Sequence, residues 1–269
     1  ISVRILGCWS RFPSALIDPQ IRPHDPPVPS AAAQRDIPPE MVYTPPDRPT
    51  TWEEGAILPV DKPEERPSFD VVEVVREGTG VEKVGHAGTL DPLATGLLII
   101  LVARPATRLQ EACMHQPKTY AATVRLGEIT PSHDAETEVV EHTDPSAVTR
   151  VDVESALEAF RGTIDQVPPM YSALHVDGER LYEKARRGET VDRPPRQVRV
   201  DRFEMVDWTP PEVSFEIECS KGTYVRALAR DLGKELGIGA HLSELRRTAI
   251  GSFSVEESWA LAALRKALS

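Results

Sequence analysis

One carboxylate stands alone in a stretch of the chain that is rich in glycine. Asp91 lies between Gly85, Gly88 and Gly96 and is followed by Pro92, which has no backbone N–H to donate. Glycine lets the backbone turn tightly and approach a ligand closely, so this loop could hold the carboxylate at a pocket floor, as a nucleophile or a stabiliser of charge. The spacing alone favours a plainer alternative, in which Asp91 caps a turn and Pro92 opens a short helix.

A tyrosine and a group of arginines are the next side chains that could do chemistry. Tyr120 leads one face of an alternating stretch, 118–127, which predicts a half-buried strand and, taken alone, a tyrosine in the core. Arg186 and Arg187 belong to a basic run, which taken alone predicts a solvated face. Neither pattern assigns a function without further evidence.

The segments that must position these residues show both helical and strand periodicity. The run 97–102 is apolar throughout, which predicts a strand buried on both faces. Ser68 and the pair Ser254 and Glu257 are typical of helix N-termini and predict a helix after each. Further strands are expected at 55–60, 118–127 and 213–219, and further helices at 104–115, 151–160 and 228–236.

Charge is distributed unevenly along the chain. The net charge of −11 disfavours an RNA partner, because phosphate contacts require lysine and arginine. The acidic excess, however, is concentrated in residues 128–165, with ten acids against two arginines. Residues 180–202 carry eight basic side chains against four acidic ones, and residues 221–247 carry six against three. The chain is therefore polarised, and its two basic segments suit a phosphate-bearing partner.

Composition predicts a disordered or extended N-terminal segment, residues 1–50, before a folded domain, residues 51–269. The first segment holds eleven of the 25 prolines and shows no periodicity. Because the first methionine is Met41, residues 1–40 are either an upstream extension or a functional tail. Three widely separated cysteines argue against a disulfide framework or a zinc site. With no apolar run long enough to span a bilayer, a cytoplasmic protein is expected.

The stretch 85–96 resembles the signature loop of the TruB family of tRNA pseudouridine synthases, in which the aspartate of G-H-x-G-x-L-D-P is catalytic. The resemblance extends over residues 55–264 in the family's order. Its other blocks are D-K-P at 61–63, K-x-Y at 118–120, P-P-x-Y-S-A at 168–173, G-x-x-x-Y-x-x-A-R-x-G at 178–188, S-x-G-T-Y-I-R at 220–226, where Val225 replaces the isoleucine, and L-R-R at 245–247.

Two other blocks depart further from the family pattern. The glycine and threonine that usually follow D-K-P are replaced by the residues Glu64-Glu65-Arg66-Pro67-Ser68. In the segment 130–135, the first acid of the family's T-D-T-x-D-A loop is absent, which leaves the role of Asp134 open.

The resemblance implies a role for each matched residue. Asp91 would be the essential carboxylate, Arg226 its ion-pair partner, Tyr120 the ring that stacks on uracil, and Tyr224 a neighbour of uracil C5. The residues implied in substrate binding are Lys62 and Leu245 at the pocket, His86 in the space left by the flipped base, and Arg186, Arg187 and Arg247.

The resemblance further implies an α+β pseudouridine synthase fold with a mixed, largely antiparallel sheet and flanking helices. No residues remain for a complete C-terminal PUA domain, which many relatives carry. The implied reaction isomerises uridine 55 in the tRNA T-loop without a metal or cofactor, and we expect a monomer that needs tRNA and no protein partner. Two alternatives stay open: a non-catalytic tRNA-folding chaperone, and the guide-RNA-dependent branch that modifies ribosomal RNA.

Overall fold

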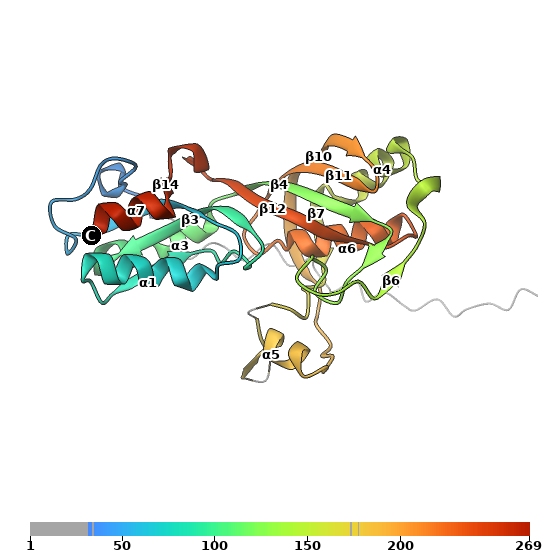
Figure 1. Ribbon diagram of the computed structural model, residues 1–269, viewed down its shortest axis with the longest axis horizontal. Helices are drawn as coiled ribbons and strands as arrows, with labels where there is room; N and C mark the ends of the chain where they lie inside the picture. Colours follow the sequence, from blue (N-terminus) through green and yellow to red (C-terminus); the bar gives the residue numbers. More distant parts are fainter. Residues whose placement is uncertain (1–31, 34, 173, 177) are drawn as a thin grey trace, which may run out of the picture.

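A ten-stranded sheet runs through the whole molecule (Figure 1). The computed structural model describes residues 32–33, 35–172, 174–176 and 178–269. The strands of this sheet are β1 (Ala56–Lys62), β2 (Val84–Ala87), β3 (Thr95–Val102), β4 (Lys118–Leu126), β7 (Gly162–Gln166), β10 (Arg196–Thr209), β11 (Glu212–Cys219), β12 (Ala240–Ile250), β13 (Phe253–Ser254) and β14 (Trp259–Ala260). Their order is β14-β1-β3-β12-β4-β11-β10-β7, with β2 beside β3 and β13 beside β12.

Two parallel pairings interrupt an otherwise antiparallel sheet. One joins β1 to β14 at an edge, and the other joins β3 to β12 in the middle. The pairing of β3 with β12 covers two positions, Thr95 opposite Arg246 and Gly96 opposite Arg247. A Cβ atom on Gly96 would lie 2.3 Å from the Arg247 carbonyl oxygen, so only glycine allows the two strands to meet here. The glycine-rich loop therefore ends where the two halves of the sheet join.

Helices cover both halves of the sheet (Figure 1). The helix α1 packs on α7, β2 and β3, whereas α6 packs on β12 and α4. The helices are α1 (Ser68–Thr79), α2 (Ala103–Thr107), α3 (Gln110–His115), α4 (Arg150–Leu157), α5 (Leu181–Arg186), α6 (Val225–Glu235) and α7 (Leu261–Leu268), with short 3₁₀ turns η1 (Pro39–Met41), η2 (Pro145–Ala147), η3 (Glu158–Phe160) and η4 (Val255–Glu257). The predicted α+β class with a mixed, largely antiparallel sheet and flanking helices is confirmed.

Two small hairpins lie outside the main sheet. One pairs β5 (Glu128–Ile129) with β6 (Glu141–His142), and the other pairs β8 (His175–Val176) with β9 (Glu179–Arg180). The second hairpin and α5 form a lobe that projects from the body of the molecule (Figure 1). Within the described residues, no helix is both long and apolar enough to cross a membrane.

Three predicted helices differ from the observed ones. Ser68 begins α1 without capping it, because its hydroxyl exchanges two 2.8 Å hydrogen bonds with the backbone of Leu90 instead. The segment 104–115 is split into α2 and α3, since Leu109 leaves the helical conformation at φ −92° and ψ 1°. Ser254 caps η4, and α7 starts only at Leu261 because Trp259 pairs in β14 with β1.

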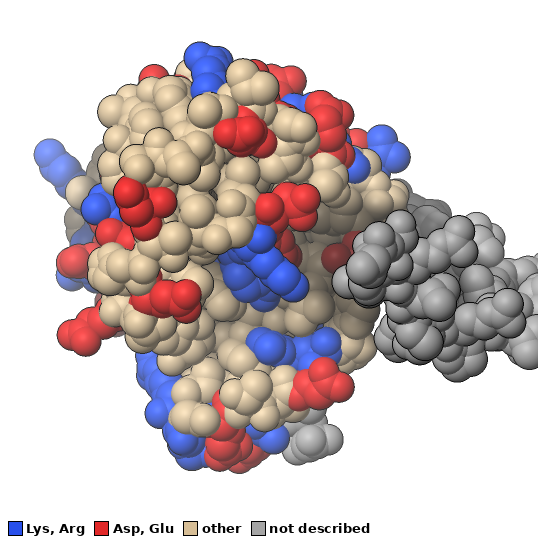
Figure 2. Space-filling view, turned by 90° about the vertical axis from the view of Figure 1, so that its right-hand side faces the viewer, with Lys and Arg blue, Asp and Glu red and all other residues tan. Residues whose placement is uncertain are grey.

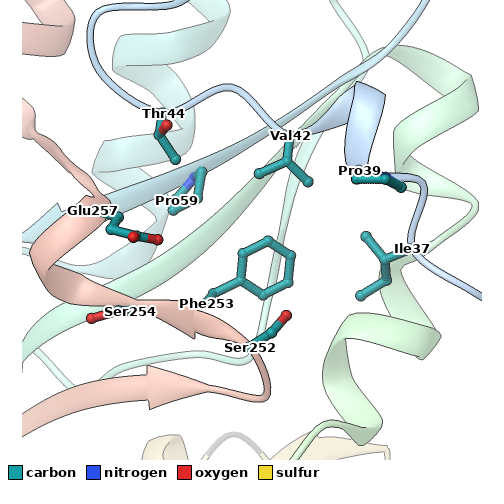
Figure 3. Close-up of a pocket in the computed structure, with 9 residues that line it drawn as sticks. All are labelled: Ile37, Pro39, Val42, Thr44, Pro59, Ser252, Phe253, Ser254 and Glu257. Atoms are coloured by element: carbon teal, nitrogen blue, oxygen red, sulfur yellow. The ribbon is translucent and has the colours of Figure 1, made fainter.

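The prediction of disorder up to residue 50 is wrong for its last part, whereas residues 1–31 and 34 lie outside the described residues. Val42 bridges to Ile57 of β1, and the Tyr43 N–H donates to the Ile57 carbonyl at 3.0 Å. Ile37 and Met41 pack with Val42 against the core beneath α2 and α3. Ile37 and Val42, together with Phe253 and Ser254 of β13, border a pocket of about 340 Å³ (Figure 3).

This packing predicts that removal of the segment 37–43 destabilises the fold. A chain that begins at Thr44 lacks Ile37, Met41 and Val42, so its free energy of unfolding should fall by about 1–3 kcal/mol. For a protein of this size the midpoint of thermal unfolding should fall by about 2–4 °C per kcal/mol. A chain that begins at Arg35 keeps these contacts and serves as the control. Equal unfolding midpoints for the two chains would show that the segment 37–43 adds nothing to stability.

Candidate active site

Asp91 and Arg226 form an ion pair near the middle of the molecule. The Asp91 Oδ2 atom lies 2.9 Å from the Arg226 Nε atom. Asp91 belongs to the loop between β2 and β3, and Arg226 to the first turn of α6. The parallel pairing of β3 with β12 brings the loop to the other half of the sheet, where α6 packs on β12. The structure therefore brings together Asp91 and Arg226, the two residues that the resemblance implies are ion-pair partners.

A second carboxylate faces the same guanidinium. The Asp134 Oδ2 atom lies 3.4 Å from Arg226 Nη1, and the two side chains are only 1% and 3% exposed. Arg226 also donates hydrogen bonds to the carbonyl oxygens of Ser132 at 3.2 Å and Tyr171 at 2.9 Å. Because these contacts fix the guanidinium from several sides, it can hold the Asp91 carboxylate in one orientation.

The ion pair borders a pocket of about 380 Å³, which we call the central pocket. Tyr120 from β4, Tyr224 from the start of α6 and Leu245 from β12 line it with the ion pair. Tyr120 and Leu245 are each 9% exposed, so their side chains form walls of the pocket and do not project into solvent. A pocket of this volume, with aromatic walls and a few converging polar groups, suits a single ring-shaped ligand.

The environment of Asp91 affects its charge in two opposing ways. Although its side chain is 37% exposed, the surrounding protein removes much of its hydration and raises its pKa above the ordinary 3.8. The Arg226 guanidinium opposes this effect because it stabilises the ionised carboxylate. The ion pair with Arg226 is therefore needed to keep the Asp91 carboxylate ionised.

This shift predicts how the reaction rate depends on pH. If the ionised form of Asp91 is required, the rate should fall as the pH is lowered through the raised pKa of Asp91. The acid limb of a single-turnover pH profile should therefore have an apparent pKa above 3.8. An acid limb at or below this value, in a protein that stays folded, would mean that another group controls the rate.

Arg247 is hydrogen-bonded to the backbone of the glycine-rich loop and of β3. Its side chain is 1% exposed, and it donates from Nε to the Leu97 carbonyl at 2.7 Å and from Nη2 to the Gly88 carbonyl at 2.9 Å. It also lines the central pocket beside Tyr120. Arg247 therefore holds the loop against β3, and its predicted contact with the substrate stays a prediction.

Lys62 has a similar internal role. The side chain is fully buried, and Nζ donates to the carbonyl oxygens of Pro63 at 2.9 Å, Arg66 at 2.7 Å and Pro92 at 3.1 Å. Burial lowers its pKa to about 8. Lys62 does not line the central pocket, so it shapes the pocket only indirectly, by holding the residue that follows Asp91.

His86 lies on β2 and is half-buried, but it does not line the central pocket. Its Nδ1 atom is buried without a hydrogen-bond partner, and its carbonyl accepts from Gln110 at 2.8 Å. Burial and the nearby Arg247 lower its pKa, which favours the neutral ring. That His86 fills the place of a flipped base stays a prediction.

Arg186 and Arg187 lie at the end of α5, on the projecting lobe. Both are exposed. The Arg186 guanidinium lies 5.7 Å above the Tyr182 ring, and Arg187 pairs with Glu179 at 3.0 Å and Glu189 at 2.7 Å. Figure 2 shows the face of the molecule that lies on the right-hand side of Figure 1. Basic side chains lie near the middle of this face and on its lower part, with acidic side chains around them.

Comparison with known proteins decides the family. The family model described as the N-terminal domain of TruB family pseudouridylate synthases matches residues 76–225, and that of the tRNA pseudouridylate synthase B C-terminal domain matches residues 226–269. The first covers more than half of the chain. This chain belongs to the TruB family.

Relatives within the TruB family agree with this assignment. A tRNA pseudouridine synthase B of Mycobacterium sp. (strain KMS) is 47% identical over 214 residues, which is 78% of this chain and 72% of the relative. The corresponding protein of Opitutus terrae is 44% identical over 208 residues, 77% of this chain and 86% of the relative. The predicted family and enzyme class are therefore confirmed.

Solved structures share the TruB fold. A Cbf5-Nop10-Gar1 complex contains a chain with a TM-score of 0.59 and 29% identity, and the match covers 82% of our chain and 56% of that one. An H/ACA RNP bound to a substrate RNA containing 2′-deoxyuridine gives a TM-score of 0.60 and 27% identity, with 87% and 60% covered. The chain thus spans somewhat more than half the length of these two proteins.

The sequence did not assign two residues that the structure brings to this TruB site. Asp134 is the second acid of a loop whose first acid is missing, and its retained position was the available signal. Gln166, at the end of β7, accepts from the Tyr224 N–H at 2.8 Å and donates to the Tyr224 carbonyl at 3.1 Å. No sequence pattern indicated Gln166, since a glutamine 58 positions away from its partner carries no local signal.

Proposed function

We propose that this protein isomerises uridine to pseudouridine in tRNA, and that its target is uridine 55 of the T-loop. The observation that carries the proposal is the Asp91–Arg226 ion pair at the edge of a pocket walled by Tyr120 and Tyr224. A non-catalytic chaperone would need a surface for RNA, but it would not need a charged carboxylate held in such a pocket.

The proposed chemistry breaks the bond between uracil N1 and ribose C1′ and forms a bond between uracil C5 and the same C1′. The C5 proton leaves and N1 gains a proton, so the composition is unchanged. Asp91 supplies the negative charge that stabilises the reacting ribose or uracil, and Arg226 holds it in place. Tyr120 stacks on the detached ring, which keeps it close enough to turn and rejoin.

Access to the pocket requires the target uridine to leave its stack in the folded loop, at a cost of a few kcal/mol. Stacking on Tyr120 offsets part of this cost, since a base stacked on an aromatic ring gains about 1–3 kcal/mol. His86 occupies the vacated space in this proposal. Recognition of a folded stem-loop by its shape suits a target inside tRNA.

We further propose that the protein works as a cytoplasmic monomer whose only required partner is tRNA. Its buried cysteines Cys113 and Cys219 are free thiols, which suits a reducing compartment. Burial raises the pKa of each thiol to about 11, so both stay protonated and unreactive at neutral pH.

The function is tested with the purified protein alone and an unmodified tRNA transcript. Pseudouridine should form at position 55 with no added cofactor or protein. A transcript with cytidine at that position is the matched control and should gain no pseudouridine. Modification at other positions, or none in a transcript that the protein binds tightly, would reject the proposal.

The projecting lobe should contribute to the grip on RNA. Replacing Arg186 and Arg187 by alanine should weaken tRNA binding and reduce the slope of log affinity against log salt by about one unit for each lost phosphate contact. The control replaces the exposed Arg104 and Arg108 on and beside α2 by alanine. If the Arg186 and Arg187 variant keeps the parent's slope of log affinity against log salt, as the control is expected to, these two arginines do not contact the tRNA.

A further inference from the structure

A second, larger pocket lies behind the loop that carries Asp91. It measures about 550 Å³, and none of its lining residues lines the central pocket. We call it the rear pocket. It is bordered by the end of β1, by α1 and by the start of α7, with Arg66, Arg246 and Arg265 among its lining residues. The proposed reaction assigns no role to it.

The lining of the rear pocket is basic although the chain is acidic. Three arginines and Lys62 border it, together with one acid, Asp61. That acid is already neutralised, because Arg246 binds both of its oxygens at 3.0 and 2.8 Å. Arg66 has only a 4.0 Å contact with Asp70, in which both side chains are about half exposed. Arg66 and Arg265 are both exposed, so their guanidinium groups are available to a further anion.

Apolar side chains share the lining of the rear pocket with the arginines. They are Pro63, Val74 of α1 and Leu261 and Ala262 of α7. A lining that is both basic and apolar suits a ligand that carries a phosphate on an organic body, because the arginines bind the phosphate while the body covers the apolar surface. A simple inorganic anion would leave the apolar side chains without a contact.

The sequence after Asp61-Lys62-Pro63 departs from the family pattern that the chain otherwise resembles. Arg66 belongs to the residues that replace the usual glycine and threonine of the TruB pattern. The two acids of the same replacement do not line the rear pocket, and Glu64 borders a separate depression beside β4. The replaced segment therefore contributes Arg66 to the lining of the rear pocket, whereas neither Glu64 nor Glu65 lines it.

From this geometry we infer that the rear pocket binds a phosphate group attached to a nucleoside, through Arg66 and Arg265 at its rim. The nucleoside phosphate belongs either to the tRNA backbone, outside the T-loop, or to a free nucleotide. In both cases the bound phosphate lies next to Lys62, which holds the Pro92 carbonyl beside Asp91. The ligand and the reacting uridine occupy different pockets.

The test compares the parent with the double variant Arg66→Gln and Arg265→Gln in the full chain. Both side chains are exposed, so the fold should be kept. The control variant, Arg104→Gln with Arg108→Gln, removes the same charge from another surface. Two readouts are used, and neither depends on turnover: calorimetric titration with AMP, and the salt dependence of tRNA binding.

If the source is a free nucleotide, AMP should bind the parent and the control, and the rear-pocket variant should bind it at least about tenfold more weakly, or by about 1.4 kcal/mol. If the source is tRNA, AMP should not bind, and the salt slope of the rear-pocket variant alone should fall by about one to two units. The inference is overturned if both readouts match the parent, or if the control changes as much as the rear-pocket variant.

Discussion

Replacing Asp91 by asparagine is expected to abolish pseudouridine formation while leaving tRNA binding within about tenfold of the parent, or about 1.4 kcal/mol. Asparagine keeps the shape of the side chain but removes the charge, so it cannot act as a nucleophile or stabilise positive charge. Binding should persist, because stacking on Tyr120 and contacts with phosphates do not use that charge.

The structure also predicts that this variant stays stable. Arg226 keeps its ion pair with Asp134 and its two backbone carbonyl partners when the Asp91 charge is lost. The loss of tRNA binding in a folded variant would assign Asp91 to the organisation of the loop. Substantial residual turnover would return it to the turn-capping role that its spacing alone favours.

Replacing Arg226 by methionine should lower both the stability of the fold and the reaction rate. The change leaves Asp134, whose side chain is 1% exposed, without its positive partner. Removing one member of a buried ion pair costs about 3–5 kcal/mol, because the remaining charge stays buried without compensation. The rate should fall at least about a hundredfold, or about 2.7 kcal/mol of transition-state stabilisation, since nothing then orients Asp91.

A second variant separates these two effects. Adding Asp134→Asn to Arg226→Met removes the uncompensated charge, so part of the lost stability should return, as measured by denaturant unfolding. The rate should not return, because the Asp91 carboxylate still has no partner. Recovery of the rate together with stability would mean that Arg226 serves only the fold.

Local sequence patterns predicted the parts of the fold that depend on local chemistry. The apolar run 97–102 forms the last six residues of β3 and is fully buried, and the alternating stretch 118–127 contains β4. The predicted helix ends were wrong where a residue distant in sequence competes with a local preference. Ser68 would cap a helix in isolation, but the backbone of Leu90 offers its hydroxyl two hydrogen bonds.

The site was predictable to the extent that its residues fall within motifs. Asp91 and Arg226 were paired by the resemblance, and the structure places their atoms 2.9 Å apart. The internal roles of Lys62 and Arg247 were not predictable, because a motif identifies a cation without saying whether it points to solvent or to a backbone carbonyl. In both cases the carbonyls that bind the cation belong to other segments of the fold.

The most direct test of the central claim follows the proton that leaves uracil C5. A tRNA transcript carrying tritium at C5 of uridine 55 alone would be mixed with excess protein in a single turnover. The account predicts release of one tritium for each tRNA by the parent and none by Asp91→Asn, while both bind the transcript. Release by the asparagine variant at the parent's rate, or no release by a parent that binds the transcript, would contradict it.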